Sequence, residues 1–209
     1  MNRKAVIIVV TLASLVVTSA AGAQMLRSNY DEPAFDLVHR TKPFELRTYQ
    51  TRVVAETTVG ADTLRAATSE GFSRLAGYIF GKNRTPEGDS SKIAMTTPVE
   101  SVPSAEGEFT VTFTMPTEYS LADLPRPRDA RIRLRELPAQ MVAIVRFGGV
   151  ARNKDVSELK RELLAYVERR GYRAASPVTV AQYDPPWIPG FLRRNELMVV
   201  VTPGGAHTQ

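Results

Sequence analysis

The sequence predicts an α+β fold in which two similar β-α-β-β halves share a joined or barrel-like antiparallel sheet, with one helix from each half packed against it. One observation is an internal repeat, because Leu46-Arg47 and Leu134-Arg135 coincide at an offset of 88 residues. Further matches at this offset are Val54-Ala55 with Val142-Ala143, Gly60 with Gly148, and Pro98 with Pro186. The other observation is that each copy reads as strand, helix, strand, strand. A long period with two copies indicates two fused halves with a pseudo-two-fold relation, about 44–120 and 130–203.

Two helices are the clearest elements of the pattern. In the first half an apolar stripe is followed by Gly81, which stands where a left-handed C-terminal cap is expected. In the second half Asp155 and Glu158 form a capping-box-like pair at the expected start of the helix, and Gly171 closes it. The stripes contain Leu64, Ala67, Gly71, Leu75, Tyr78 and Ile79 in the first helix and Val156, Leu159, Leu163, Tyr166 and Val167 in the second.

The strands show a period of two instead of 3.6. Residues 110–115 alternate threonine with valine, phenylalanine and methionine, and residues 141–147 alternate apolar side chains with neighbours that include Arg146. Proline-rich loops are expected at residues 86–91, 124–128 and 185–190. Because the halves meet at the joined sheet, the cleft between them is the expected ligand site.

The composition removes several classes of function. The chain has 209 residues, 43% of them hydrophobic and 23% charged, which is typical of a globular domain with a real core. It has no cysteine, so disulfides, thiolate nucleophiles and cysteine-ligated metals are excluded. With two histidines, His39 and His207, a catalytic triad or a histidine metal centre is not expected. A formal net charge of +5 is too small to indicate a nucleic-acid partner.

The first 23 residues predict a signal peptide. A basic start at Arg3 and Lys4 precedes an apolar run, and Ala21-Gly22-Ala23 offers the small residues that a signal peptidase requires. We expect cleavage after Ala23 and a periplasmic or secreted protein; the alternative is a retained anchor, and only then a contact with the membrane. Residues 24–43 are expected to form an N-terminal extension, and residues 204–209 a flexible tail.

Several longer runs resemble the SOUL haem-binding protein family. They are residues 44–49, 71–83, 92–99 and 183–196, which occur in the order that the family has. The resemblance implies a SOUL domain over residues 44–203, built as a pseudo-symmetric, distorted antiparallel β-barrel with two main helices. It also implies a haem-binding or tetrapyrrole-binding protein, with the porphyrin held non-covalently in an apolar groove beside the first helix, for buffering or transport. The same architecture resembles bacterial effector-binding domains that hold flat amphipathic molecules.

The predicted porphyrin contacts lie on the first helix. A porphyrin needs a flat apolar surface and, at one edge, cationic or hydrogen-bonding groups for its two propionates. Core packing is the better interpretation for Leu75, whereas for Phe72 and Ala76 a ligand contact and a core contact are equally supported. Family members tend to carry basic residues at the positions of Ser69 and Gly77, which are uncharged here, so Arg65 is the first choice for the propionates and Arg74 the second. The predicted contacts are Arg65, Thr68, Ser69, Phe72, Leu75 and Ala76.

The iron has no obvious ligand in this sequence. Some family members place a histidine where this chain has Thr48, and neither His39 nor Met95 is a strong substitute. We therefore expect no metal-ligating residue and no stable axial ligand.

Two groups of arginines have a less specific interpretation. Arg131, Arg133 and Arg135 form a basic stripe, either a solvated face or a surface that collects an anion. The run Arg193-Arg194-Asn195-Glu196 is expected to form a structural polar network that holds the last strand.

Three classes of function remain. The leading class is an exported tetrapyrrole-binding protein, and the second is a binding module for another flat amphipathic molecule. The third is an enzyme acting on a tetrapyrrole, for which Glu45, Glu56, Tyr49 and Tyr183 would supply the chemistry. No pairing among these four is visible in the sequence, so no catalytic residue is predicted, and no protein partner is indicated.

Overall fold

The computed structural model describes residues 30–204 except residue 152, and it gives no side-chain detail for residues 153–155. The predicted signal peptide, most of the predicted tail and His207 therefore lie outside the described residues. Among the described residues, no helix combines the length and the apolar character that crossing a membrane requires.

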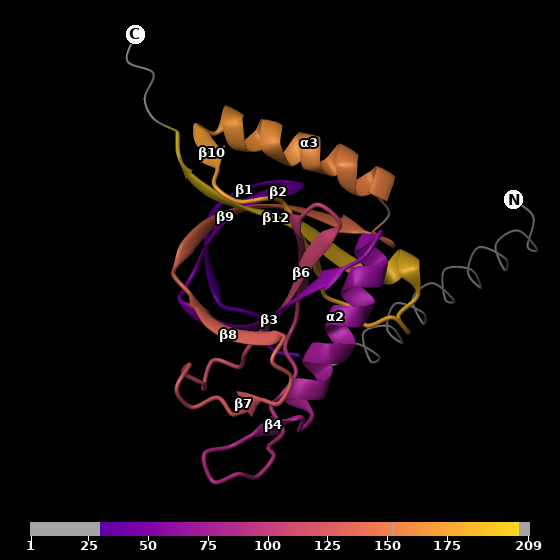
Figure 1. Ribbon diagram of the computed structural model, residues 1–209. Coiled ribbons are helices and arrows are strands. Elements are labelled where there is room, and N and C mark those ends of the chain that lie inside the picture. Colours follow the sequence, from indigo (N-terminus) through magenta and orange to yellow (C-terminus); the bar gives the residue numbers. More distant parts are fainter. Residues whose placement is uncertain (1–29, 152, 205–209) are drawn as a thin grey trace, which may run out of the picture.

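Most of the chain forms one curled antiparallel sheet (Figure 1). Its path runs β1-β2-β9-β12-β11-β5-β6-β3-β8, and β10 adds to β12. The strands are β1 (Phe35–Thr41), β2 (Phe44–Tyr49), β3 (Arg52–Gly60), β5 (Val99–Ala105), β6 (Glu108–Thr114), β8 (Ile132–Leu137), β9 (Gln140–Gly148), β10 (Tyr172–Ala174), β11 (Thr179–Gln182) and β12 (Arg194–Pro203). A separate pair consists of β4 (Asn83–Arg84) and β7 (Arg126–Pro127), and the short helix η1 (Gly190–Leu192) precedes β12.

Two helices lie against the outside of the curled sheet (Figure 1). Helix α2 (Leu64–Ile79) packs on β3 and β6, and helix α3 (Asn153–Arg169) packs on β9, β10 and β12. Thr63 caps α2 by accepting a hydrogen bond from the backbone N–H of Ala66. The glycine that follows each helix has a positive φ, +112° at Gly81 and +77° at Gly171, as the sequence predicts.

The predicted start of α3 is wrong. The helix begins at Asn153, two residues before Asp155, so Asp155 lies inside the first turn and is not the cap. The apolar stripe begins only at Val156, so the first turn carries no periodic signal that would have marked its true start.

The apolar residues form two main cores, one under each helix. The first core joins α2 to β3 and β6 through side chains such as Leu75, Ile79 and Val111. The second core joins α3 to β9 and β12 through Leu163, Val145 and Leu197, and it includes Leu46 of β2. At Gly71 an added Cβ would lie 2.5 Å from the side chain of Val111, so a glycine is what lets α2 approach β6.

The other face of the sheet is also enclosed, because the sheet curls around it. On β6, Val111 and Phe113 face α2, and the alternating Thr112 and Thr114 are buried as well. On β9, Val142 and Ile144 are buried on the inner side, and Ala143 and Val145 on the outer side. The alternation predicted for these strands is present; the polar Thr112 and Thr114 of β6 are buried on the inner side of the sheet, whereas Arg146 of β9 is exposed.

The fold class is confirmed as α+β with two main helices and a curled antiparallel sheet. Residues 24–43 contribute β1, which pairs with β2. The pseudo-two-fold duplication of the two halves stays a prediction.

Candidate functional site

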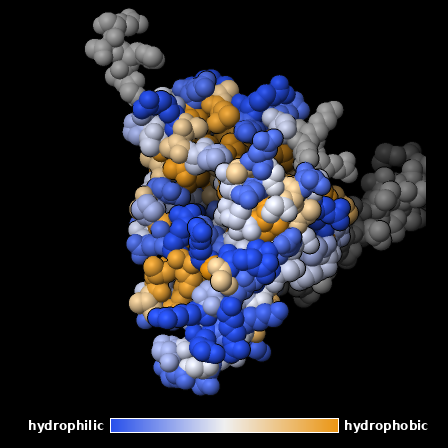
Figure 2. Space-filling model, in the orientation of Figure 1, coloured by the Kyte–Doolittle hydropathy of each residue, from blue (hydrophilic) through white to orange (hydrophobic). Residues whose placement is uncertain are grey.

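A cavity of about 420 Å³ lies inside the curled sheet, within the size range of small-molecule pockets. Figure 2 shows that the face over this interior is hollowed and bordered by hydrophilic residues. The cavity is lined by Arg52, Glu56, Glu100, Val102, Thr110, Thr112, Arg135, Leu137, Gln140, Val142, Ala175, Ser176, Pro177, Thr179, Met198, Val199 and Val200. These residues come from seven strands of the sheet, which are β3, β5, β6, β8, β9, β11 and β12, and from the loop before β11.

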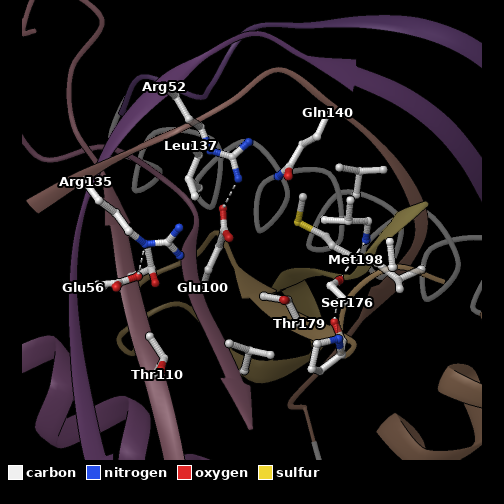
Figure 3. Close-up of a pocket in the computed structure, with 17 residues that line it drawn as sticks. Arg52, Glu56, Glu100, Thr110, Arg135, Leu137, Gln140, Ser176, Thr179 and Met198 are labelled. Carbon is white, nitrogen blue, oxygen red and sulfur yellow. Dashed lines mark hydrogen bonds and ion pairs between the residues drawn. The ribbon is translucent and has the colours of Figure 1, made fainter. Parts of the chain in front are cut away.

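One wall of the cavity carries four charges arranged as two ion pairs (Figure 3). Arg52 of β3 contacts Glu100 of β5 at 3.3 Å, and Arg135 of β8 contacts Glu56 of β3 at 2.8 Å. The charges cancel, so the wall is polar without a net charge. Arg135 belongs to the basic stripe of the sequence, and its pairing shows that this member of the stripe borders the cavity.

The pair of Arg52 and Glu100 is incompletely satisfied. Their side chains are only 10% and 15% exposed, and a single hydrogen bond joins them. The Nε–H of Arg52 is buried and has no hydrogen-bond partner among the described residues. Burial raises the pKa of Glu100, and the positive charges of Arg52 and Arg135 only partly oppose this effect.

The opposite wall is uncharged (Figure 3). Val142 and Met198 supply apolar surface, and Gln140 and Thr179 supply polar groups. Ser176 already accepts a hydrogen bond from the backbone N–H of Val200, at 3.0 Å, so its oxygen fixes the loop before β11. A molecule in the cavity would therefore meet charges on one side and a mixed, largely apolar surface on the other.

A second group of polar side chains forms a buried network around Glu196; we call it the Glu196 network. Arg47 donates to both carboxylate oxygens of Glu196, at 3.0 and 3.1 Å, and Tyr183 donates to one of them at 2.7 Å. Arg194 donates to Glu196 at 3.1 Å and lies over the ring of Tyr183. Tyr49 accepts from Arg47 and lies under Arg52, which links the network to the cavity. The structural network predicted for residues 193–196 is confirmed at Arg194 and Glu196.

The ionisation of the Glu196 network follows from its contacts. Burial opposes the charge of Glu196, but the hydrogen bond and charge of Arg47, helped by Tyr183 and Arg194, lower the pKa of this carboxyl. Burial and the neighbouring Glu196 raise the pKa of Tyr183. The carboxylate is therefore held ionised and the phenol neutral, which is the pattern of a fixed structural ion pair.

Three of the four residues considered for an enzyme meet at this network. Tyr49, Tyr183 and Glu45 all lie within one contact of Arg47 or Glu196. Tyr49 and Tyr183 are buried, and Glu45 is partly buried. The fourth residue, Glu56, lies in the cavity and pairs with Arg135.

The predicted porphyrin contacts lie on the other side of the sheet, along α2. Arg65, Ser69, Phe72 and Ala76 follow one flank of the helix, because residues four apart lie on one face; we call this surface the α2 flank. Thr68 lies beside them, and its hydroxyl is 2.9 Å from that of Ser101 on β5. Phe72 is half-buried and packs edge-on against Phe113, with ring centroids 5.4 Å apart.

Two of the predicted residues point inward. Leu75 is completely buried in the first core, which confirms the core interpretation, and Ala76 is largely buried. A ligand on the α2 flank would reach Leu75 only if the core opened. The flank itself therefore consists of the remaining residues with Ala76 at its inner border.

The two arginines proposed for the propionates differ in their surroundings. Arg65 is exposed and has no hydrogen bond or ion pair within the described residues. Arg74 lies on the opposite side of α2, where its guanidinium donates to Glu70, to the hydroxyl of Thr57 and to a backbone carbonyl of β3. The second choice, Arg74, is thus engaged elsewhere, and Arg65 is the arginine that faces the flank.

The structure also places the three iron candidates. His39 lies on β1, where its Nε2 is 2.9 Å from the hydroxyl of Thr41. Met95 packs against the first core, and Thr48 lies on β2. In the part of the chain that the structure describes, no group of three or more histidine, aspartate or glutamate side chains could hold a metal ion.

The sequence analysis missed Arg52 and Glu100. They are 48 residues apart, and only the pairing of β3 with β6 and of β6 with β5 brings them together. The one available signal was that Arg52 and Glu100 are charged residues next to apolar residues in predicted strands. That signal does not say whether the charge faces solvent or an enclosed interior.

Comparison with known sequences gives one family and one curated relative. The sequence profile described as "SOUL heme-binding protein" matches residues 30–200. Heme-binding protein 1 of Xenopus laevis is 28% identical over 163 residues, which cover 75% of this chain and 83% of that protein.

Solved structures share the fold at low sequence identity. A hydrolase from Listeria innocua is 11% identical with a TM-score of 0.55, over 79% of this chain and 94% of that chain. The C-terminal domain of EcmrR is 13% identical with a TM-score of 0.58, over 77% of this chain and 97% of that chain. At these identities the similarity concerns the fold alone.

Proposed function

Because the chain belongs to the SOUL haem-binding family, we propose that it holds haem or a related tetrapyrrole non-covalently against the α2 flank, for buffering or transport. The observation that carries this site is the half-buried ring of Phe72, which lies among small side chains on the outside of the fold. A flat macrocycle needs such a surface, since large neighbours would hold it away from the helix.

The macrocycle is proposed to stack on Phe72. The ring is held from behind by Phe113, so it offers a rigid aromatic surface at little cost in conformational entropy. Ser69 and Ala76 lie one helical turn before and after Phe72 and are small enough for a flat ring to approach. Apolar contact with the ring then supplies most of the binding free energy.

Arg65 is proposed to pair with a propionate. Its guanidinium is unengaged and lies two turns from Phe72 on the same flank. An arginine fork matches a carboxylate in a bidentate geometry, and at an exposed site the gain is modest. The propionate contact would therefore determine the orientation of the porphyrin more than it increases the binding affinity.

The iron is proposed to have no strong protein ligand. His39 is on the edge strand β1 and next to Thr41, and the family's occasional histidine is Thr48 here. When haem is bound, its chemistry would be that of an iron with an open or exchangeable axial position. Iron-free protoporphyrin should then bind within about tenfold of haemin, a difference of about 1.4 kcal/mol.

A titration with haemin, protoporphyrin and protoporphyrin dimethyl ester tests this proposal. Phe72→Ala should weaken all three about tenfold or more, whereas Leu121→Ala, which removes an exposed apolar side chain elsewhere, should change nothing. Arg65→Glu should weaken haemin more than the ester, because only free carboxylates carry the charge; Arg133→Glu is its matched control. Normal haemin binding by a folded Phe72→Ala variant would place the site elsewhere.

Export is proposed from the sequence of residues 1–23. The charge, apolar run and small-residue end of this segment support cleavage after Ala23. Intact-mass measurement should find Gln24 as the first residue of a protein released by disruption of the outer membrane. A species that retains Met1 and sediments with membranes would contradict the proposal and indicate an anchor.

An internal duplication is proposed as the origin of the fold. The strand pairing supports it, because β2 of the first half pairs with β9, and β8 of the second half pairs with β3. Reciprocal pairing of this kind is expected when two copies are related by a two-fold axis. In an experimental structure, residues 44–116 should superpose on residues 132–203 with both helices aligned; helices that fail to align would argue against it.

A further inference from the structure

We propose that the cavity inside the curled sheet is a second ligand site, separate from the α2 flank, which binds a small zwitterion with an apolar body. A free amino acid with an apolar side chain is the simplest molecule of this class. The proposal rests on the unsatisfied pair of Arg52 and Glu100, on the zero net charge of the cavity wall and on the apolar surface opposite.

The first support is the unpaired donor of Arg52. Its side chain is nine-tenths buried, and its Nε–H has no partner among the described residues. A buried donor without an acceptor costs free energy, and the cost is greater for a charged group. An oxygen of a ligand carboxylate placed in the cavity would remove this cost.

The second support is the poorly compensated negative charge of Glu100. A single hydrogen bond of 3.3 Å joins it to Arg52, so the charge of this buried carboxylate is poorly compensated. An ammonium group beside it would supply the missing charge. Since Arg52 and Glu100 are neighbours, the two groups of the ligand must be close together, as they are on one α-carbon.

The zero net charge of the cavity wall favours a zwitterion over a ligand that carries a net charge. Arg52, Arg135, Glu56 and Glu100 sum to zero, so a ligand with a net charge of either sign would enter a partly buried space uncompensated. Such a charge is costly to desolvate. A zwitterion adds no net charge and can pair with both members of the Arg52 and Glu100 pair.

The opposite wall defines the rest of the ligand. Met198, which Figure 3 labels, provides apolar contact for a hydrocarbon side chain, and Val102 and Val142 also line the cavity. A cavity of about 420 Å³ is at the small end of ligand pockets. A wall with four charges is also a poor surface for a flat apolar macrocycle, which separates this site from the porphyrin site.

The two sites lie on opposite faces of the same sheet. On β6, Thr110 and Thr112 line the cavity, and Val111 and Phe113 pack toward α2. Ligands in the two places therefore share no side chain, and variants of one site serve as controls for the other.

Calorimetric titration with three molecules of the same body tests the ligand class. L-Phenylalanine carries both charges, 3-phenylpropionate carries only the carboxylate, and 2-phenylethylamine carries only the ammonium. We expect phenylalanine to bind at least about tenfold more tightly than either analogue. Equal or tighter binding of one analogue would overturn the zwitterion assignment, and binding of none would overturn the proposal.

Variants locate the binding. Arg52→Gln and Glu100→Gln should each weaken phenylalanine about tenfold or more and leave haemin binding unchanged, and Arg133→Gln should leave both unchanged. Thr110→Phe, which fills the cavity, provides a second test if the charge variants do not fold, with the far-ultraviolet circular dichroism spectrum as the measure of folding. Unchanged phenylalanine binding in a folded Thr110→Phe variant would overturn the site. Loss of haemin binding in Phe72→Ala with phenylalanine binding retained shows that the two proposals stand separately.

Discussion

Replacing Arg47 by methionine tests how much the Glu196 network stabilises the fold. Glu196 has no exposed surface, and Arg47 donates to both of its oxygens. Removing one member of a buried ion pair costs about 3–5 kcal/mol, because the other charge stays buried without compensation. Arg194 and Tyr183 remain as partners of the carboxylate, so we expect the lower end, about 3 kcal/mol.

The loss is measurable by urea unfolding followed by circular dichroism. In thermal unfolding of a domain of this size, a loss of about 3 kcal/mol corresponds to a decrease in Tm of roughly 6–12 °C. The control is Arg40→Met, since Arg40 is half-exposed and pairs with Glu45 at 2.9 Å; its loss should cost less than about 1 kcal/mol. The double variant Arg47→Met with Glu196→Leu should recover most of the stability, because it removes both charges. Equal small losses in Arg47→Met and Arg40→Met would refute the assignment of a stabilising buried pair.

Three further measurements test the packing and the ionisation. Leu75→Ala should open a cavity in the first core and cost roughly 2–5 kcal/mol in urea unfolding, with or without porphyrin. Gly71→Ala should also destabilise, by about 1–3 kcal/mol, because the new Cβ would lie 2.5 Å from Val111; unchanged stability would mean that α2 shifts freely on the sheet. Because the pKa of Glu196 is lowered in the folded state, its stabilisation is present above the ordinary pKa of 4.5 and is lost as the pH falls below it. The free energy of unfolding should therefore fall less steeply below pH 4.5 in Glu196→Gln than in the parent protein.

The helices were predictable because their signals are local. The apolar stripe from Leu64 to Ile79 coincides with the bounds of α2, and Gly81 takes the positive φ that its position suggested. A stripe over several turns is hard to produce by chance, and a glycine cap depends only on the backbone beside it. The start of α3 was missed because its first turn carries no apolar residue.

The cavity was not predictable because its signal is not local. A period of two says that Thr110 and Thr112 share a face, but the curl of the sheet decides whether that face is solvent or interior. Arg52 and Glu100 meet only through the pairing of three strands. No spacing along the chain encodes this contact.

The candidate site on α2 could be predicted in part. The helical period separated Leu75 from Phe72, and the structure buries the first and leaves the second half-exposed. The same period also places Arg74 about 180° round the helix from Arg65, so it could have excluded Arg74 from the flank that carries Arg65 and Ser69. Only the partners of Arg74 on β3 show that it is already engaged.

The pairing of β2 with β9 and of β3 with β8 has a consequence for how the chain assembles. Every member of the first core lies between Val53 and Leu134, so the contiguous stretch from β3 to β8 contains a complete core. The second core needs Leu46 of β2, which pairs with Ala143 of β9 and must wait for that strand to be synthesised. The stretch that contains the first core is therefore displaced by one strand from the proposed repeat. A chain cut between β8 and β9 would yield one fragment with its core complete and another that requires an N-terminal strand supplied from outside.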